Sequence, residues 1–298
     1  MLFVDIKIGY QCNNYCFFCI QGEKRTTHKA KTLQEIKDIL FQEFSRGVRG
    51  VNFTGGEPTI FKTLIPAIEY AKSLGYKTIK IQSNGQTFGD LRYCVTLIKA
   101  GANLFEPSIH GYKPETHDYL VQTKGAWKKV VNGINNLKKL GQIVFINSVI
   151  TKQNYKEIPL LAELLLKLNV DYFQFAFPHI GGSAKKYHEM IVPKKTEIMP
   201  YIYKAISKAK SLNKVARTEA IPFCFMKGYE YAIAEKYNPD TSIFDGEFSM
   251  SSYKNYKLNE GKAKHEKCET CIKNRVCEGP WREYPELYGW EEFTPILI

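Results

Sequence analysis

The chain has no apolar run long enough to cross a membrane. Its longest candidate, Ile158 to Leu168, is short and is interrupted by Glu163 and Lys167, whereas a membrane-spanning helix needs about 18 uninterrupted apolar residues. The first residues, Met1 to Asp5, also lack the basic segment that begins a secretory signal. Eight cysteines without an export signal are expected to be reduced metal ligands. We therefore expect a cytoplasmic protein without disulfides and without membrane contact.

The sequence also lacks a dense basic block, although it is basic overall. Its 42 Lys and Arg residues against 30 Asp and Glu residues give a formal charge of +12. Because the lysines are dispersed along the predicted helices, a nucleic-acid partner is not expected. A basic surface favours acidic partners, such as a reduced electron-transfer protein or a polyanionic substrate. A lysine-rich surface without a binding role is an equally good interpretation.

Apolar strand-like runs alternate with helical patterns through the first 213 residues, which is typical of α/β proteins with a parallel sheet. The expected strands are Leu2–Ile8, Gly50–Phe53, Thr78–Gln82, Asn103–Ser108, Ile143–Ile150 and Tyr172–Phe177. Six such β/α units of about 35 residues fall short of the roughly 250 residues of an eightfold barrel. We therefore predict a partial (β/α)6 TIM barrel over residues 1–213 and a small domain over residues 214–298.

Several predicted helices have recognisable boundary residues. Thr32 and Glu35 form a capping box before a helix that runs from Leu33 to Phe44. Asp90 is predicted to cap a later helix, which Gly101 ends. Further helical patterns run from Trp127 to Leu137, from Asn154 to Leu168, and onward from Thr196.

Three cysteines follow the first predicted strand. Cys12, Cys16 and Cys19 have a C-x3-C-x2-C spacing. Three thiolates so close in sequence can converge on one side of a loop and hold three irons of a 4Fe–4S cube. The fourth iron then has no protein ligand and is open to a substrate or cofactor. A zinc knuckle is the alternative, although structural zinc sites usually have four ligands.

A second motif, Gly55-Gly56-Glu57-Pro58, follows the second predicted strand. Together with the cysteine spacing it resembles the radical S-adenosylmethionine (SAM) superfamily, which places these two motifs after the first and second strands of a partial barrel. The resemblance implies that SAM chelates the open iron and that the glycine-rich segment binds the methionine ammonium. Two glycines allow backbone carbonyls to approach closely, and Glu57 supplies negative charge. An ordinary turn is the alternative for this segment.

Further segments resemble the SAM pocket of the same superfamily. Ser83 and Asn84, after the third predicted strand, resemble a Thr-Asn-Gly segment whose hydroxyl and amide approach methionine or ribose. Ser108, after the fourth, resembles a serine that contacts SAM, and Phe18 is expected near adenine. All these residues lie in the cysteine loop or after predicted strands, and parallel barrels build their sites at the carboxyl ends of strands.

The chain does not identify a catalytic acid or base. Glu106 is a candidate because strand alternation places it on the same face as Ser108, but a barrel-wall carboxylate paired with Lys or Arg is the better interpretation. His110 is expected to order a loop, with an acid–base role as the alternative. Cys94 has core spacing on its predicted helix and is expected to be a packing residue.

Four cysteines remain for a second metal site. Cys224 is followed by Cys268, Cys271 and Cys277 in a C-x2-C-x5-C spacing, which fits zinc and 4Fe–4S equally. The segment resembles the SPASM and twitch extensions of radical SAM enzymes, which implies an auxiliary 4Fe–4S cluster. Trp281 stands where the full SPASM pattern has a cysteine, so a twitch-like domain with one cluster is the better match. If Cys224 lay elsewhere, one iron would stay open to substrate.

The resemblance implies a radical SAM enzyme that cleaves SAM reductively and abstracts a hydrogen atom from its substrate. A low-potential donor such as a flavodoxin or ferredoxin would supply the electron. The expected outcome is oxidative modification of a peptide or protein, although the chain shows no leader-binding domain before the first strand. A small-molecule dehydrogenase or cofactor-biosynthesis enzyme is the first alternative. A non-catalytic zinc or iron–sulfur binding module is the second.

Overall fold

The computed structural model describes residues 2–246 and 248–297, and its centre is one curved sheet of nine strands. The strands lie in the order β7-β6-β5-β4-β3-β2-β1-β8-β9. Their bounds are β1 Phe3–Gly9, β2 Gly50–Gly55, β3 Thr78–Ser83, β4 Leu104–Pro107, β5 Ile143–Val149, β6 Tyr172–Ala176, β7 Val215–Glu219, β8 Thr241–Asp245 and β9 Phe248–Met250. All neighbours pair in parallel except β8 and β9. The predicted partial α/β barrel is confirmed.

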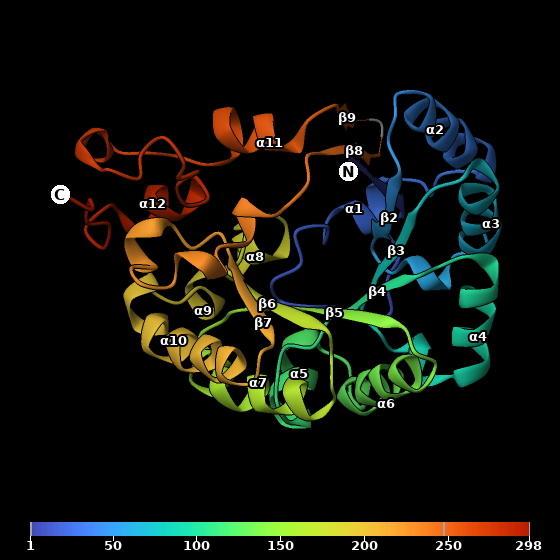
Figure 1. The fold of residues 1–298 in the computed structure, drawn as a ribbon, viewed down its shortest axis with the longest axis horizontal. Coiled ribbons are helices and arrows are strands. Elements are labelled where there is room, and N and C mark those ends of the chain that lie inside the picture. Colours follow the sequence, from blue (N-terminus) through green and yellow to red (C-terminus); the bar gives the residue numbers. More distant parts are fainter. Residues whose placement is uncertain (1, 247, 298) are drawn as a thin grey trace.

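Helices surround the outer side of this sheet (Figure 1), as they do in parallel barrels. The longer ones are α2 Leu33–Ser45, α3 Leu64–Leu74, α4 Leu91–Ala100, α5 Pro114–Val121, α6 Ala126–Lys139, α7 Ile158–Lys167 and α10 Lys195–Ser211. The short ones are α1 Lys24–Thr27, α8 Ser183–Lys186, α9 His188–Ile191, α11 Tyr253–Tyr256 and α12 Glu283–Tyr288. Within the described residues, none of these helices combines the length and apolarity that a membrane crossing requires.

Strand alternation divides the side chains of the sheet between two environments. On β1, Val4, Ile6 and Ile8 are fully buried in the main apolar core. Asp5 and Lys7 alternate with them and line a cavity inside the barrel. The other strands repeat this arrangement, since successive side chains of a strand point to opposite faces. The apolar core therefore lies between sheet and helices, and the barrel interior carries both polar and apolar side chains.

The predicted helix boundaries agree with the structure. The capping box of α2 is present, with the Thr32 hydroxyl accepting from the Glu35 N–H and the Glu35 carboxylate accepting from the Thr32 N–H. Asp90 caps α4 by accepting a hydrogen bond from the Arg92 N–H at 2.9 Å, and Gly101 ends that helix with a φ of 131°. Glycine tolerates this backbone conformation because it has no Cβ.

The sheet is wider than the six strands predicted from the sequence. Strand β7 extends it beyond β6, and β8 pairs with β1 at the opposite edge. Both come from the segment after residue 213, as does the hairpin strand β9. Helix α5 was also missed by the pattern of apolar residues. The division into domains at residues 213/214 stays a prediction, although three strands of the second segment hydrogen-bond within the barrel sheet.

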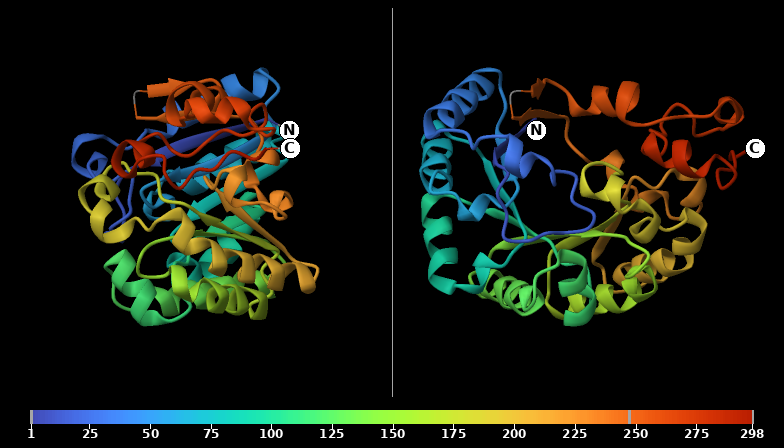
Figure 2. Two further views of the ribbon diagram at one scale, coloured as in Figure 1. Left: turned by 90° about the vertical axis from the view of Figure 1, so that its left-hand side faces the viewer. Right: turned by 180° about the vertical axis from the view of Figure 1, so that it is seen from behind.

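The C-terminal segment also packs on the far side of the barrel. The fully buried Lys195 ammonium, at the start of α10, lies 3.0 Å from the ring centroid of Phe177 and 4.6 Å from that of Tyr284 in α12. Figures 1 and 2 show the segment, orange to red, bridging from β8 at one edge of the sheet to α10 at the other. The residues after β7 therefore contact both edges of the barrel.

Candidate functional site

One cavity of about 870 Å³ occupies the barrel interior and reaches the carboxyl ends of the strands. The three cysteines of the loop after β1, Cys12, Cys16 and Cys19, contribute to its wall. The same wall contains Gly55 and Gly56 at the end of β2. The structure therefore brings together the two motifs that carried the sequence interpretation, at the edge where parallel barrels have their sites.

The cysteine loop is held by contacts to two other loops of the barrel. The Tyr15 N–H donates to the Val121 carbonyl at the end of α5, at 2.9 Å. The Asn14 side chain accepts a hydrogen bond of 2.6 Å from Gln86, which lies after β3. These contacts explain why an irregular loop keeps one conformation, since its polar groups have partners within the fold.

The cysteine side chains and their neighbour Arg25 fit an anionic metal cluster. Burial, together with the charges of Cys19 and Cys12, raises the pKa of Cys16 well above its ordinary value. Bound metal would stabilise such crowded thiols as thiolates. Burial also raises the pKa of Cys12, and the Arg25 guanidinium opposes the increase at both cysteines only in part. The buried Nη1 of Arg25 has no hydrogen-bond partner among the described residues. An unpartnered cationic donor beside three thiols fits an iron–sulfur cluster or the SAM carboxylate.

The two glycines of the second motif are required by the cysteine loop itself. The Gly56 N–H donates to the Gly9 carbonyl at 2.8 Å. A Cβ on Gly56 would lie 2.3 Å from the carbonyl oxygens of both Tyr10 and Gln11. Gly55 has a φ of +127° and packs equally closely against Gly9. The absence of Cβ atoms at Gly55 and Gly56 therefore allows the backbone at the start of the cysteine loop, residues 9–11, to pack directly against the end of β2.

Glu57 is engaged by hydrogen-bond donors of the protein itself. Its side chain is fully buried and does not line the cavity. The carboxylate accepts hydrogen bonds from the Ser83 hydroxyl at 2.8 Å, from the Asn84 N–H at 2.6 Å and from the Thr59 N–H at 3.0 Å. These donors hold the carboxylate in place, so Glu57 organises the ends of β2 and β3. Its expected role toward the methionine ammonium stays a prediction.

The other residues expected to contact SAM do reach the cavity. Ser83, Asn84, Ser108 and Phe18 all line it. The Ser108 N–H donates to the Ser83 carbonyl at 3.0 Å, which aligns the ends of β3 and β4. Asn84 approaches the Cys12 sulfur at 3.8 Å. Their contacts with SAM stay a prediction, which this common location supports.

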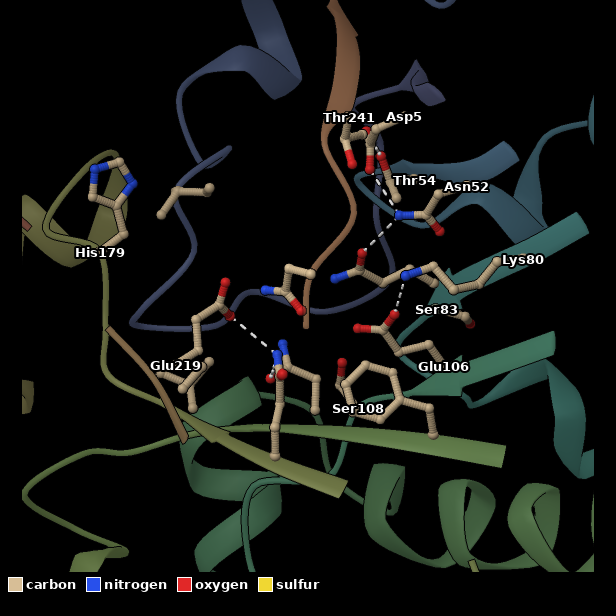
Figure 3. A pocket seen from close by; sticks show the side chains of 18 of the residues that line it. Asp5, Asn52, Thr54, Lys80, Ser83, Glu106, Ser108, His179, Glu219 and Thr241 are labelled. Carbon is tan, nitrogen blue, oxygen red and sulfur yellow. Dashed lines mark hydrogen bonds and ion pairs between the residues drawn. The ribbon is translucent and has the colours of Figure 1, made fainter. Parts of the chain in front are cut away.

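His110 and Glu106 occupy the roles that the sequence favoured. The His110 ring accepts from the Val149 N–H at 3.1 Å, and its carbonyl accepts from Asn154 at 2.8 Å, so it orders the loop after β4. Glu106 forms an ion pair with Lys80 at 2.6 Å (Figure 3). Cys94 is fully buried in the core, as expected.

The four remaining cysteines also lie together. Cys224, Cys268, Cys271 and Cys277 line one small, mainly apolar pocket outside the barrel interior. Burial raises the pKa of Cys224 to about 12, and the charges of the other three thiols add to this effect. The pocket fits a second metal centre with four thiolate ligands. No group of three His, Cys, Asp or Glu side chains in residues 2–246 and 248–297 matches the geometry of a single-ion site.

The barrel cavity and the four-cysteine pocket are adjacent. Glu278, which lines the cavity, directly follows Cys277, which lines the pocket. The Glu278 carboxylate lies 2.8 Å from the Lys262 ammonium, which is 1% exposed and also contacts Glu235 at 2.7 Å. Neighbouring residues of the chain therefore line the two sites, and one of them, Glu278, belongs to a buried ion network.

Three polar residues of the cavity were not found from the sequence. Asn147 on β5, Gln174 on β6 and Glu219 on β7 line the cavity. Asn147 and Gln174 are paired in register, and the Gln174 side chain reaches Glu219 through a hydrogen bond of 3.0 Å. Polar residues alternating with apolar ones in these segments were the available signal.

Solved structures with the same fold span nearly the whole chain. "Crystal structure of Streptococcus suis SuiB bound to S-adenosylmethionine" matches with a TM-score of 0.71 and 17% identity, over 93% of this chain and 72% of that one. "Native anSMEcpe with bound AdoMet and Kp18Cys peptide" matches with the same TM-score and identity, over 99% of this chain and 92% of that one. At this identity the likeness concerns the fold.

Sequence comparison identifies the family. A curated relative from Saccharolobus islandicus (strain M.14.25 / Kamchatka #1), "Probable GTP 3′,8-cyclase", is 30% identical over 216 residues, which is 70% of this chain and 67% of the relative. A protein from Saccharolobus solfataricus with the same name is 29% identical over the same length. The model of the radical SAM superfamily matches residues 6–165. The chain belongs to the radical SAM superfamily, whose members are enzymes that use a 4Fe–4S cluster and SAM.

Proposed function

We propose that this enzyme oxidises a peptide or protein side chain held in the barrel cavity. Cys12, Cys16 and Cys19 would hold the SAM-binding cluster. The observation that carries the proposal is that these thiols share one cavity with the twin-glycine turn, Ser83 and Ser108. When bound, the cofactors provide radical chemistry, in which one electron cleaves SAM to methionine and a 5′-deoxyadenosyl radical that takes a hydrogen atom from substrate.

The residues of the chain bind and orient the reactants. Ser83, Asn84 and Ser108 present hydroxyl and amide groups to SAM, and Arg25 offers an unpartnered donor to an anion. Phe18 is 9% exposed and provides an apolar wall for adenine. Holding SAM and substrate in one cavity replaces a bimolecular encounter with a positioned reaction and keeps water away from the radical.

The four-cysteine pocket supports an oxidative outcome. A two-electron oxidation removes one electron and one proton from the substrate in addition to the abstracted hydrogen atom. An auxiliary 4Fe–4S cluster held by Cys224, Cys268, Cys271 and Cys277 would have no open iron, and such a site suits electron transfer better than substrate binding. Its proximity to the cavity through Glu278 supports this assignment.

A small-molecule substrate is the second candidate, because the curated relatives are named as probable GTP 3′,8-cyclases. A nucleoside triphosphate requires several cationic groups that are free to bind phosphate. Three lysines that line the cavity, Lys7, Lys80 and Lys257, already form ion pairs with carboxylates. Arg25, Arg217 and Lys254 also line the cavity and form no ion pair with a carboxylate among the described residues. These cationic groups support a phosphorylated substrate as the second candidate.

The test is anaerobic reconstitution followed by incubation with SAM and dithionite. We expect about eight irons per chain and formation of 5′-deoxyadenosine. An intact, reduced cluster that forms no 5′-deoxyadenosine would instead indicate a non-catalytic metal-binding module. Incubation with a peptide library or with GTP then separates the candidates, because mass spectrometry would detect a peptide lighter by two hydrogens or a cyclised nucleotide. About four irons per chain would contradict the auxiliary cluster.

A further inference from the structure

Among the residues that the structure describes, Glu219 differs from the other carboxylates of the barrel cavity because it forms no ion pair with a cationic side chain. The five other lining carboxylates form ion pairs with lysines: Asp5 with Lys7, Glu106 with Lys80, Asp171 with Lys138, Glu235 with Lys262 and Glu278 with Lys257. Among the described residues, no Lys, Arg or His lies within ion-pair distance of Glu219. The cavity therefore contains one carboxylate whose charge the fold itself does not neutralise.

Glu219 is placed at the rim that faces the SAM-binding loops. It ends β7 and pairs in register with Ala176, which ends β6. Its backbone is fixed there, because its carbonyl accepts from the Phe177 N–H at 2.9 Å. Figure 3 shows its side chain pointing into the cavity, with Glu106 entering from the β4 side and Ser108 between them.

The Glu219 carboxylate is held in place on one side and open on the other. Oε2 accepts a hydrogen bond of 3.0 Å from the Gln174 side chain, which also approaches Asn147 at 3.3 Å. Oε1 accepts no hydrogen bond from any residue in the described parts of the chain. Gln174 therefore fixes the direction of the carboxylate, and one oxygen remains available to a ligand in the cavity.

The surroundings of Glu219 make a cationic ligand favourable. Burial and the nearby charge of Glu235 raise its pKa, and Lys262 and Lys257 compensate only in part. The Glu235 Oε2 is buried and has no hydrogen-bond partner among the described residues, and the same is true of the Asn52 Oδ1 on the cavity wall. Acceptors without donors are costly to bury, so a ligand that brings donors and positive charge would be stabilised.

We propose that Glu219, oriented by Gln174, binds a cationic group of the substrate, namely an ammonium or guanidinium such as a lysine or arginine side chain of a peptide. This inference rests on the proposed function and specifies its substrate class. Charge-assisted hydrogen bonds of this kind are both strong and directional.

Arg217 is the group that would favour an anionic substrate instead. It precedes Glu219 by two residues, lines the same cavity, and stacks over the Tyr237 ring at 4.2 Å. By register it lies level with Gln174, deeper in the barrel than Glu219. An anion bound to Arg217 would lie close to the Glu219 carboxylate, so an anionic substrate is the outcome that the experiment must exclude.

The experiment measures binding to the reconstituted, full-length enzyme with SAM present and without reductant. The probes are Nα-acetyl-lysine amide, Nα-acetyl-arginine amide, the uncharged Nα-acetyl-norleucine amide, and GTP, titrated by calorimetry. We expect at least one cationic probe to bind about tenfold more tightly than the norleucine probe. Glu219→Gln should remove this preference and leave norleucine binding unchanged. Glu219→Asp, which keeps the charge, should retain it.

The matched control is Glu163→Gln, which removes a carboxylate from the exposed face of α7, away from the cavity. It should bind the probes as the wild type does. Equal binding of the lysine, arginine and norleucine probes, tighter binding of GTP, or a cation preference that survives in Glu219→Gln would overturn the assignment. SAM cleavage by the wild type is measured in parallel with dithionite, so that failure of the proposed function is recognised separately.

Discussion

The Lys24 ammonium donates a hydrogen bond of 2.6 Å to the Asp245 carboxylate, although 221 residues separate the two in sequence. The Tyr10 hydroxyl donates to the other oxygen of the same carboxylate. Asp245 ends β8, and Tyr10 lies two residues before Cys12. The C-terminal part of the chain is therefore fastened directly to the start of the cysteine loop.

Asp245→Asn should weaken the contact of Asp245 with Lys24 and Tyr10, because it removes the negative charge and keeps the size of the side chain. Although burial acts to raise the pKa of Asp245, the hydrogen bonds from Lys24 and Tyr10 hold it below 3.8. A depressed carboxylate pKa stabilises the fold above the unfolded pKa, and the contribution is lost as the pH falls through the folded pKa. We expect the cluster-free variant to lose about 1 kcal/mol of unfolding free energy at pH 7. In urea titrations, the difference in unfolding free energy between the wild type and Asp245→Asn should be smaller at pH 3 than at pH 7. An equal difference at both pH values would contradict the stabilising role of the ionised Asp245.

Gly56→Ala should prevent the close contact between the second motif and the cysteine loop. The new methyl group would meet two carbonyl oxygens of the loop at 2.3 Å, and backbone atoms cannot move aside as a side chain can. We expect a loss of more than about 2 kcal/mol in unfolding free energy, together with poor cluster reconstitution measured by iron content. Gly181→Ala is the control, because nothing lies within 4 Å of its added Cβ. Equal unfolding free energies and iron contents of the two variants would show that the space around Gly56 is not required.

The ion pair between Lys80 and Glu106 should stabilise the fold, because both side chains are largely buried. Their side chains are 18% and 4% exposed, so removing either one leaves the other charge poorly solvated. We expect Glu106→Gln to cost about 3 kcal/mol of unfolding free energy. The double variant with Lys80→Met should lose less than the sum of the single losses. Chemical unfolding of the four proteins measures this coupling, and additive losses would show that the pair does not interact.

Cys224→Ser tests the second metal site independently of the first. If all four cysteines of the pocket bind one cluster, iron content after reconstitution should fall from about eight to about four per chain. Formation of 5′-deoxyadenosine without substrate should persist, because Cys12, Cys16 and Cys19 are intact. Cys94→Ser is the control: its thiol donates to the Phe88 carbonyl at 3.2 Å in the core, outside both cysteine sites. Unchanged iron in Cys224→Ser would place this cysteine outside the ligand set.

Much of the barrel could be predicted from the sequence because its units are local. The capping box of Thr32 and Glu35 and the Asp90 cap each involve residues a few positions apart. The apolar residues of β1 recur every second position, which the core face of a strand requires. The order of these units then placed the motif cysteines and glycines at one edge of the sheet.

The pairing of β8 with β1 could not be predicted in the same way. These strands are more than 230 residues apart, and nothing in the local pattern of residues 241–245 indicates which edge they join. Glu57 shows the same limitation for a side chain, since its motif could not indicate the hydrogen bonds that it accepts from Ser83 and Asn84 at the end of β3. Glu219 is a further example. It has no ion pair among the described residues because the nearby Lys257 and Lys262 form ion pairs with Glu278 and Glu235, which come from another part of the chain.

The sequence by itself determined the fold class, the family and the residues of both cysteine sets, because spacing and periodicity are properties of neighbouring residues. Only the tertiary structure decided that the C-terminal strands complete the barrel sheet, that Glu57 is internal and that Glu219 faces the cavity without a cationic partner. The reason is that burial, ion pairing and exposure to a cavity arise from contacts between distant segments, which the folded chain alone establishes.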